Sequence, residues 1–378
     1  MSVSIVHAAD LHLESSFAGL PPAQAALRRE DLKHTFLQII EFAAKEKAQI
    51  LLFAGDLFEH DRAGRELMHF LNSGFSRLNA RVFVSPGNHD PGLPGSPYWS
   101  FPWAENVHIF REEIEAVPLE ELGCVVYGLG FAHFAVKDPL LRGFQVKDPE
   151  QINLMVLHGD DRTNPLAAAS SSNYLPFTAS DLALAGADYY ALGHHHRPRV
   201  IWEEQGLVKA CYAGSTEPLG FGEEGEHGVF FGTVGKEQSQ LRFVRLNQRS
   251  YRTLTLRCSG EGYLEQLVEL ALQQIPAVER QRDLFRLIYA GEVEPALEFD
   301  RIKLEELLSP HFFHCRVEND TVSNYDLNSL DTRTVRGMFT AKLQALLQEA
   351  EAEEDKELFR KTLYYGLDAL NLGKVGER

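Results

Sequence analysis

Residues 50–60 read ILLFAGDLFEH, and the rest of the sequence can be organised around this stretch. A short apolar run closed by Gly55 and Asp56 is typical of a strand that is buried on both faces. Such a strand would present the Asp56 carboxylate where its backbone ends. Because a Gly-Asp pair after a strand is most often only a turn, a functional interpretation requires the same pattern elsewhere in the chain.

Four further predicted strands end in polar side chains, and they cover residues 4–9, 81–84, 152–157 and 189–192. A helix of about four turns is predicted between the first of them and residues 50–53, after a Pro-Pro break, which implies parallel pairing. Parallel strands bring their carboxyl ends to one rim of a sheet. The polar residues at the five strand ends are Asp10, His12, Asp56, Asn88, His89, His158, His194 and His196.

This set combines carboxylate, imidazole and amide groups without a thiolate. Such donors suit Mn²⁺, Fe²⁺ or Zn²⁺ in a catalytic site better than a structural Zn²⁺ site. The set exceeds what one ion uses, and Asp56 is placed to bridge two. Two ions activate water and neutralise phosphate oxygens, which predicts hydrolysis of a phosphoester. Each motif alone also fits a loop or a core histidine, but their recurrence at strand ends favours a metal site.

The motifs resemble, in order and spacing, the signature set of the calcineurin-type metallophosphoesterases. They are Asp10-x-His12, Gly55-Asp56, Gly87-Asn88-His89-Asp90, His158 and Gly193-His194-x-His196. The surrounding sequence resembles more narrowly the SbcD-like and YhaO-like DNA-repair nucleases. The resemblance covers residues 1–246 and implies an α/β fold, namely a metallophosphoesterase β-sandwich flanked by helices. Beyond Tyr251 the resemblance is architectural.

The resemblance also implies roles for the motif residues. It implies one divalent ion held by Asp10, His12, Asp56 and His196, and a second held by Asp56, Asn88, His158 and His194. Mn²⁺ is the expected metal, with Fe²⁺ or Zn²⁺ as alternatives. His89 is expected to be the catalytic imidazole, with Asp90 orienting it. The chain departs from the nuclease branch at Glu59, where a histidine often stands, and His60 follows; the roles of both are left open.

The net charge of −17, from 37 Lys and Arg against 54 Asp and Glu, gives no global attraction for nucleic acid. A DNA substrate would therefore have to be held by local cations. Candidates are Arg197 and Arg199, and a series near the predicted domain junction: Arg242, Arg245, Arg249, Arg252 and Arg257. These side chains fit an ordinary solvated surface equally well.

A partner that supplies much of the grip on DNA would reconcile the acidic chain with such a substrate. In the resembled nucleases the partner is a coiled-coil ATPase of the SbcC or YhaN type, and the nuclease also forms a homodimer. The first of two predicted terminal helices carries an apolar stripe that could dock a partner or pack on its own domain. The stripe is Val335, Met338, Phe339, Leu343, Leu346, Leu347 and Ala350.

Three domains are predicted. They are a nuclease domain (1–250), a small α/β capping domain with a β-α-β-α-β pattern (251–330) and a C-terminal helical segment (331–378). Residues 91–102 are predicted to form a long surface loop beside a site, and residues 163–177 an irregular loop. The four cysteines show no paired spacing, and no apolar run reaches about 18 residues. A cytoplasmic protein that does not bind a membrane is therefore expected.

The sequence thus predicts a metal-dependent DNA phosphodiesterase, an exonuclease of DNA repair. A phosphodiesterase for a nucleotide or another small ester is the first alternative, because the same ions would serve it. A non-catalytic scaffold subunit of an ATPase complex is the second, although the intact ligand set argues against it.

Overall fold

The computed structural model describes residues 2–164, 171–327 and 331–372. The chain divides into two compact units, Met1–Ser250 and Tyr251–Arg378. The loop predicted over residues 163–177 lies partly outside the described residues. The predicted separation of residues 331–378 from the capping domain stays a prediction.

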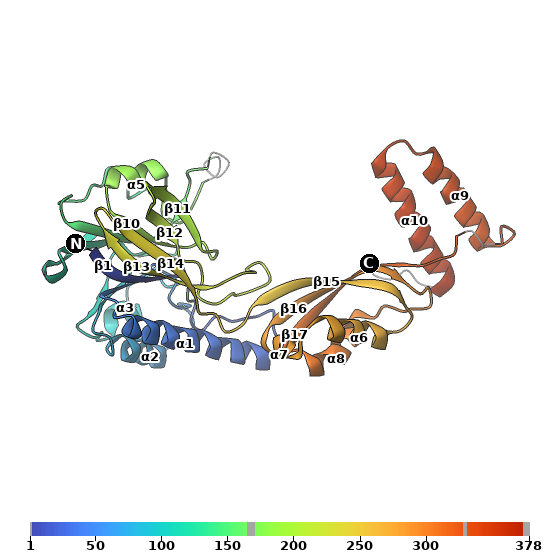
Figure 1. Ribbon diagram of the computed structural model, residues 1–378, viewed down its shortest axis with the longest axis horizontal. Helices are drawn as coiled ribbons and strands as arrows, with labels where there is room; N and C mark the ends of the chain where they lie inside the picture. Colours follow the sequence, from blue (N-terminus) through green and yellow to red (C-terminus); the bar gives the residue numbers. More distant parts are fainter. Residues whose placement is uncertain (1, 165–170, 328–330, 373–378) are drawn as a thin grey trace. The chain divides into compact units, whose positions relative to one another are not determined.

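The first unit contains two six-stranded sheets (Figure 1). The first sheet has the order β14-β13-β1-β2-β3-β4, with parallel pairing from β1 to β4 and antiparallel pairing of β13 and β14. Its strands are β1 (Ser2–Ala8), β2 (Ile50–Phe53), β3 (Arg81–Val84), β4 (Val107–Ile109), β13 (Gly228–Gly235) and β14 (Ser239–Arg245).

The second sheet has the order β11-β12-β10-β7-β6-β5. Its four inner strands are parallel and its two edge strands, β5 and β11, are antiparallel to their neighbours. The strands are β5 (Glu115–Leu119), β6 (Cys124–Gly128), β7 (Ile152–His158), β10 (Tyr189–Gly193), β11 (Arg199–Glu204) and β12 (Leu207–Tyr212). A short pair, β8 (Asp160–Asp161) and β9 (Pro176–Phe177), follows β7.

Strand β2 shows why its sequence is apolar throughout. Ile50 and Leu52 pack in the core between the two sheets, whereas Leu51 and Phe53 face the helices on the other side. Helices α1 (Pro22–Lys45) and α2 (Arg65–Phe75) cover the first sheet, and α5 (Ala179–Ala185) covers the second. The layers helix, sheet, sheet, helix confirm the predicted β-sandwich flanked by helices.

Three local expectations are corrected. Helix α1 has 24 residues rather than about four turns, because Pro22 is accommodated in its first turn. Strand β12, expected in an antiparallel set, pairs antiparallel with β11 but in parallel with β10. Residues 91–102, expected as a surface loop, contain α3 (Pro97–Ser100), and Tyr98 is buried against the carboxylate of Asp90.

The 3₁₀ helix η1 (Glu120–Leu122) lies between β5 and β6.

The second unit contains the predicted β-α-β-α-β pattern. Its parallel sheet has the order β15-β16-β17 (Figure 1). The buried faces of α6 and α8 share one core with this sheet. Its elements are β15 (Tyr251–Glu261), α6 (Leu264–Gln274), α7 (Ala277–Arg282), β16 (Leu284–Val293), α8 (Arg301–Leu308), η2 (Ser309–His311) and β17 (His314–Ser323).

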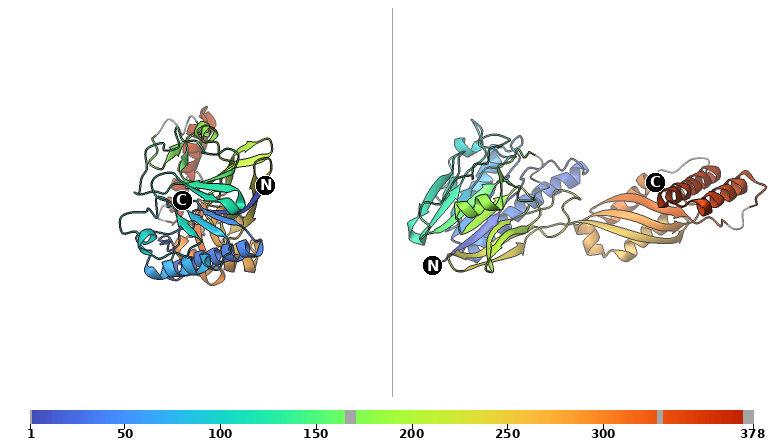
Figure 2. Two further views of the ribbon diagram at one scale, coloured as in Figure 1. Left: turned by 90° about the vertical axis from the view of Figure 1, so that its left-hand side faces the viewer. Right: turned by 90° about the horizontal axis from the view of Figure 1, so that it is seen from above.

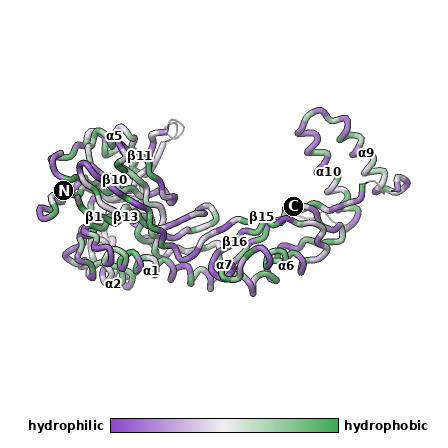
Figure 3. Tube along the Cα trace, viewed as in Figure 1, coloured by the Kyte–Doolittle hydropathy of each residue, from purple (hydrophilic) through white to green (hydrophobic). Residues whose placement is uncertain are grey.

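Helices α9 (Val335–Glu349) and α10 (Glu353–Leu372) end the described chain and lie side by side (Figure 2). Both mix apolar and polar residues along their length (Figure 3). The predicted stripe on α9 is divided: Leu343 is buried against α10, whereas Val335 and Met338 are 66% and 55% exposed. Part of the stripe therefore packs within its own unit.

Candidate metal centre

The strand ends that carry the predicted ligands turn sharply. Asp10, His12, Asp56 and His194 have positive φ angles of 51°, 46°, 52° and 107°. Residues other than glycine adopt such angles rarely, at a cost of about 1–3 kcal/mol each, and most often at functional sites. Backbone bonds enforce them, since Asp10 N–H donates to Gly55 O (3.0 Å) and His12 N–H to Asp56 O (2.9 Å). The ends of β1 and β2 are thereby held side by side.

The polar side chains form three overlapping groups of possible metal donors. In each group the donor atoms lie within 4.8 Å of one another. The groups are Asp10, His12 and His196; His12, Asp56 and His89; and Asp10, Asp56 and His158. Asp56 Oδ2 lies 3.7 Å from His12 Nε2 and 3.4 Å from His158 Nε2, so it stands between two of the imidazoles. With 2% exposure, Asp56 is buried among these donors rather than presented to solvent.

The histidine rings are oriented with one nitrogen toward the centre. His12 Nδ1 lies 2.8 Å from Glu59 Oε1, and His196 Nδ1 lies 2.7 Å from Glu223 Oε1. A carboxylate accepts hydrogen bonds, so each Nδ1 carries a hydrogen, and each Nε2 has a free lone pair when its imidazole is neutral. These two Nε2 atoms face each other at 3.2 Å. Two facing lone pairs beside buried carboxylates fit a bound cation.

The electrostatics agree with a site built for positive charge. Burial raises the pKa of Asp10. At Asp56, burial acts to raise the pKa, but the neighbouring imidazoles of His158 and His12 outweigh it, and the pKa is lowered. At His196, burial acts to lower the pKa, but Glu223 and Asp10 outweigh it and raise the pKa to about 9. The carboxylates therefore favour a cation beside them, either a proton or a metal ion.

The second predicted ligand group is held differently. His158 Nδ1 lies 3.0 Å from the carbonyl oxygen of Ala54, and its Nε2 lies 2.9 Å from Asn88 Oδ1. The His194 ring packs against His158, with ring centroids 5.2 Å apart, and its backbone N–H donates to Asp10. His194 thus lies beside the three donor groups without belonging to them, and Asn88 contacts His158, which belongs to one. The roles of Asn88 and His194 as ligands stay predictions.

His89 is paired with Glu59, a residue to which the sequence assigned no role. His89 Nδ1 lies 3.0 Å from Glu59 Oε2, while the other oxygen of Glu59 faces His12. This hydrogen bond raises the pKa of His89 to about 9. Burial acts to raise the pKa of Glu59, but hydrogen bonds from both imidazoles hold it at about 2. The departure from the nuclease branch at position 59 was the one signal for this contact.

Asp90 does not have the contact predicted for it. Its carboxylate accepts hydrogen bonds from the backbone N–H groups of Asp56 (3.1 Å), Leu57 (2.6 Å) and Gly87 (2.6 Å), and from the Tyr98 hydroxyl (2.6 Å). Burial, followed by the charge of Asp56, raises the pKa of Asp90 to about 6. These bonds direct its oxygens to the loops after β2 and β3 and none of them reaches the His89 ring, so the role of Asp90 in orienting His89 stays a prediction.

Three other histidines have contacts outside these groups. His7 is buried between the Tyr189 hydroxyl and the Leu192 carbonyl. His195 Nε2 lies 3.3 Å from Asp160. His60 donates its backbone N–H to His89 O, and its ring packs on Phe134.

Several of the arginines that were candidates for contacting DNA contact other groups of the chain. Arg249 Nε lies 2.8 Å from Asp31, and Arg252 contacts Glu279 (2.7 Å). Arg199 stacks over the Tyr212 ring at 5.5 Å, and Arg197 donates to Gly222 O (3.2 Å). Both Arg197 and Arg199 are exposed, so they remain the candidates for substrate contact.

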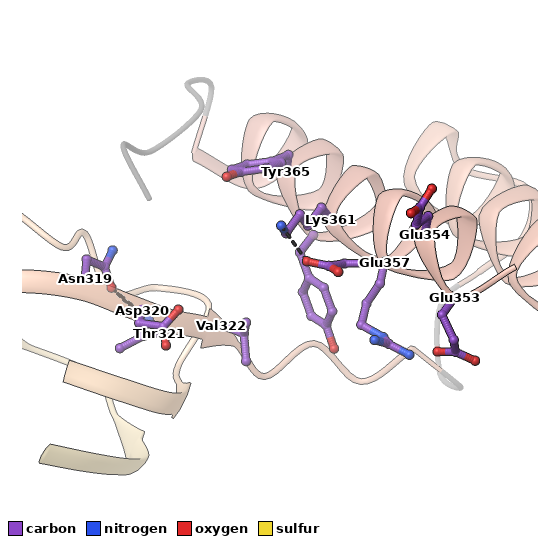
Figure 4. A pocket seen from close by; sticks show the side chains of 11 residues that line it. Asn319, Asp320, Thr321, Val322, Glu353, Glu354, Glu357, Lys361 and Tyr365 are labelled. Carbon is purple, nitrogen blue, oxygen red and sulfur yellow. Dashed lines mark hydrogen bonds and ion pairs between the residues drawn. The ribbon is translucent and has the colours of Figure 1, made fainter. Parts of the chain in front are cut away.

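A separate cavity of about 600 Å³ lies in the second unit, between β17 and α10 (Figure 4). Its charged residues partly neutralise each other, since Lys361 Nζ lies 2.7 Å from Glu357. The described residues that line it include no histidine. This cavity therefore does not offer the donor set found at the sandwich.

A two-sheet sandwich with carboxylates and imidazoles at its strand ends is the arrangement of a metal-dependent phosphoesterase. Residues 3–198 of the 378 match the calcineurin-like phosphoesterase family. The chain therefore belongs to this family, which confirms the resemblance seen in the sequence.

The sequence of the chain is similar to those of three curated relatives. The chain is 31% identical over 257 residues to the uncharacterized metallophosphoesterase YhaO of Bacillus subtilis. It is 26% identical over 245 residues to the DNA double-strand break repair protein Mre11 of Methanopyrus kandleri, and 25% over 251 residues to a subunit of the nuclease SbcCD of Staphylococcus epidermidis. These matches cover 64%, 57% and 58% of this chain, but 60%, 49% and 63% of the relatives. Among the described residues, no helix combines the length and hydrophobicity that crossing a bilayer requires.

Proposed function

We propose that this protein is a metal-dependent DNA phosphodiesterase, specifically an exonuclease of DNA repair. The observation that carries the proposal is that Asp56 stands between the His12 and His158 imidazoles while His89, with its raised pKa, lies at the same centre. The names of two relatives, a double-strand break repair protein and a nuclease subunit, support DNA as the substrate.

In this proposal Asp10, His12, Asp56 and His196 hold one ion, and Asp56, Asn88, His158 and His194 hold the other. Mn²⁺ suits these oxygen and nitrogen donors, as do Fe²⁺ and Zn²⁺. The ions, when bound, supply a nucleophilic water at neutral pH and offset the charge of the phosphate. His89, protonated through its bond to Glu59, donates a proton to the leaving oxygen. Arg197 and Arg199 would contact the DNA backbone.

A phosphodiesterase for small esters is the second candidate. The net charge of −17 and the pairing of Arg249 and Arg252 with carboxylates favour it, because they leave few cations for a long polyanion.

The two candidates can be separated with one protein preparation. Metal-free protein is reloaded with Mn²⁺ and assayed on linear DNA and on bis(p-nitrophenyl) phosphate. We expect cleavage of both, and a loss of about 10²–10⁴-fold in DNA hydrolysis for His89→Gln, with Mn²⁺ binding retained. His133→Gln, which changes an exposed histidine, is the matched control. Unchanged DNA hydrolysis in His89→Gln would contradict the mechanism, and turnover of the small diester without DNA cleavage would favour the second candidate.

The metal assignment has its own test. Asp56→Asn should weaken binding of both Mn²⁺ ions, whereas His158→Ala should chiefly weaken one, as measured by calorimetric titration. Equal effects of the two substitutions would contradict the bridging role of Asp56.

A coiled-coil ATPase of the SbcC or YhaN type is the proposed partner, together with a homodimer in the cytoplasm. The exposed Val335 and Met338 of α9 form the proposed contact. Co-purification from the native host tests the partner, and Met338→Asp should weaken it without affecting hydrolysis of the small diester. If the Met338→Asp variant still co-purifies with the ATPase, Val335 and Met338 do not form the contact.

A further inference from the structure

The loop between β12 and β13 places a hydrogen-bonded carboxylate behind His196. Glu223 Oε1 lies 2.7 Å from His196 Nδ1. The other oxygen of Glu223 accepts hydrogen bonds from the backbone N–H of Leu219 (2.9 Å) and from the Ser215 hydroxyl (3.2 Å). Both oxygens are thus engaged, and the side chain is held in one orientation.

A buried histidine fixes the backbone of this loop. His227 is 1% exposed, and its Nε2 lies 2.8 Å from the carbonyl oxygen of Glu223. Its Nδ1 lies 3.0 Å from both the hydroxyl and the carbonyl oxygen of Ser215. His227 therefore joins Ser215 and Glu223, which are eight residues apart in the loop.

The loop is also anchored to the rest of the first unit. The carbonyl oxygen of His227 accepts the backbone N–H of Leu246 (2.9 Å) beyond the end of β14. On the other side, the fully buried Glu217 pairs with Arg28 of α1 (2.9 Å). A loop of residues 213–227 that is tied at both ends loses little further entropy when Glu223 contacts His196.

The contact with Glu223 determines the hydrogen position and the orientation of the His196 ring. Because Glu223 can only accept, Nδ1 of His196 carries the hydrogen, and its Nε2 points to the centre, 3.2 Å from His12 Nε2. Histidine ligands of metal ions commonly donate their second nitrogen to such a group, and loss of that group lowers metal affinity by about 10–100-fold.

We propose that Glu223 is a positioning residue that fixes the tautomer and orientation of His196, and that Ser215 and His227 hold Glu223 in place. This inference rests on the proposed function in taking His196 as a metal ligand. Glu223 positions His196 from the loop between β12 and β13, which contains none of the strand-end motifs.

The test compares Glu223→Gln with Glu226→Gln in the 378-residue chain. Glu226 lies on the same loop but is exposed. Glu226→Gln therefore removes the same negative charge from the loop without removing the contact to His196. Titration with Mn²⁺ alone should show one ion bound about 10–100-fold more weakly in Glu223→Gln, and affinities unchanged in Glu226→Gln. In the metal-free protein at a pH above the His196 pKa of about 9, where the ring is neutral, ¹⁵N NMR should show the Nδ1–H tautomer of His196 in the wild type and a mixture in Glu223→Gln.

His196→Ala separates the inference from the proposed function. If His196→Ala binds both Mn²⁺ ions as tightly as the wild type, His196 is not a ligand and the proposed metal assignment fails. If His196→Ala loses one ion while Glu223→Gln binds both normally and keeps the wild-type tautomer, the positioning role alone is overturned.

Discussion

The carboxylate of Glu59 joins two imidazoles, with Oε2 at 3.0 Å from His89 Nδ1 and Oε1 at 2.8 Å from His12 Nδ1. One side chain thus contacts both a proposed metal ligand and the proposed acid. Glu59 is itself held by the backbone bond from its N–H to Leu13 O (2.9 Å).

Glu59→Gln should therefore slow DNA hydrolysis more than hydrolysis of a p-nitrophenyl diester. A p-nitrophenolate leaves without much protonation, whereas the leaving oxygen of a sugar needs a proton from His89. We expect a loss of about 10–100-fold in kcat on DNA. Glu115→Gln, which breaks a similar pair with His108 (3.1 Å), should leave both activities unchanged. Equal losses on the two substrates would contradict the link between Glu59 and His89.

Asp90→Asn should chiefly destabilise the fold. The buried carboxylate accepts four hydrogen bonds, and an amide cannot replace all of them, which leaves buried donors unsatisfied. We expect a loss of at least about 2 kcal/mol in the free energy of unfolding, measured by urea denaturation. Tyr98→Phe removes one of these bonds and should cost about 1 kcal/mol. A stable Asp90→Asn protein with impaired proton donation by His89 would instead support the original prediction from sequence.

His7 should make stability depend on pH. Burial lowers the pKa of His7 from 6.5 to about 3. Between these values the unfolded chain binds a proton that the folded protein excludes. Its contribution to the free energy of unfolding is therefore complete above pH 6.5 and is lost as the pH falls toward 3, by about 1.4 kcal/mol per pH unit.

His7→Phe should reduce this slope, as measured by urea denaturation between pH 7 and pH 5 with excess chelator. The chelator prevents metal release from contributing to the slope. His34→Gln, a change of an exposed histidine, should keep the wild-type slope. Identical slopes in His7→Phe and the wild type would contradict the assignment.

Gly193→Ala should prevent the two sheets from meeting at the site. An added Cβ would lie 1.8 Å from the carbonyl oxygen of Ala54, so the ends of β2 and β10 would have to separate. We expect a marked loss of thermal stability, with Mn²⁺ affinity reduced. Gly19→Ala adds a Cβ with no atom within 4 Å and should unfold like the wild type. Wild-type stability of Gly193→Ala would show that this close approach is not required.

The sequence alone determined the five strands that end at the site and the polar residues at their ends. An apolar run such as residues 50–53 records burial on both faces locally, and a parallel strand delivers whatever follows it to a known rim. Asp10, His12 and Asp56 could therefore be predicted to meet, and in the structure they do. His158 ends β7 of the other sheet, so its place beside them depends on how the two sheets pack.

The tertiary structure decided which groups stand behind these residues. Glu59 was visible as a departure from the resembled nucleases, but its contact with His89 depends on how two loops fold together. Glu223 lies in a loop without periodicity, 27 residues from His196, and Asp90 follows His89 directly yet bonds elsewhere. Hydrogen bonds between loops depend on distances that the chain sets only after the sheets have packed, and no local pattern of residue types records those distances.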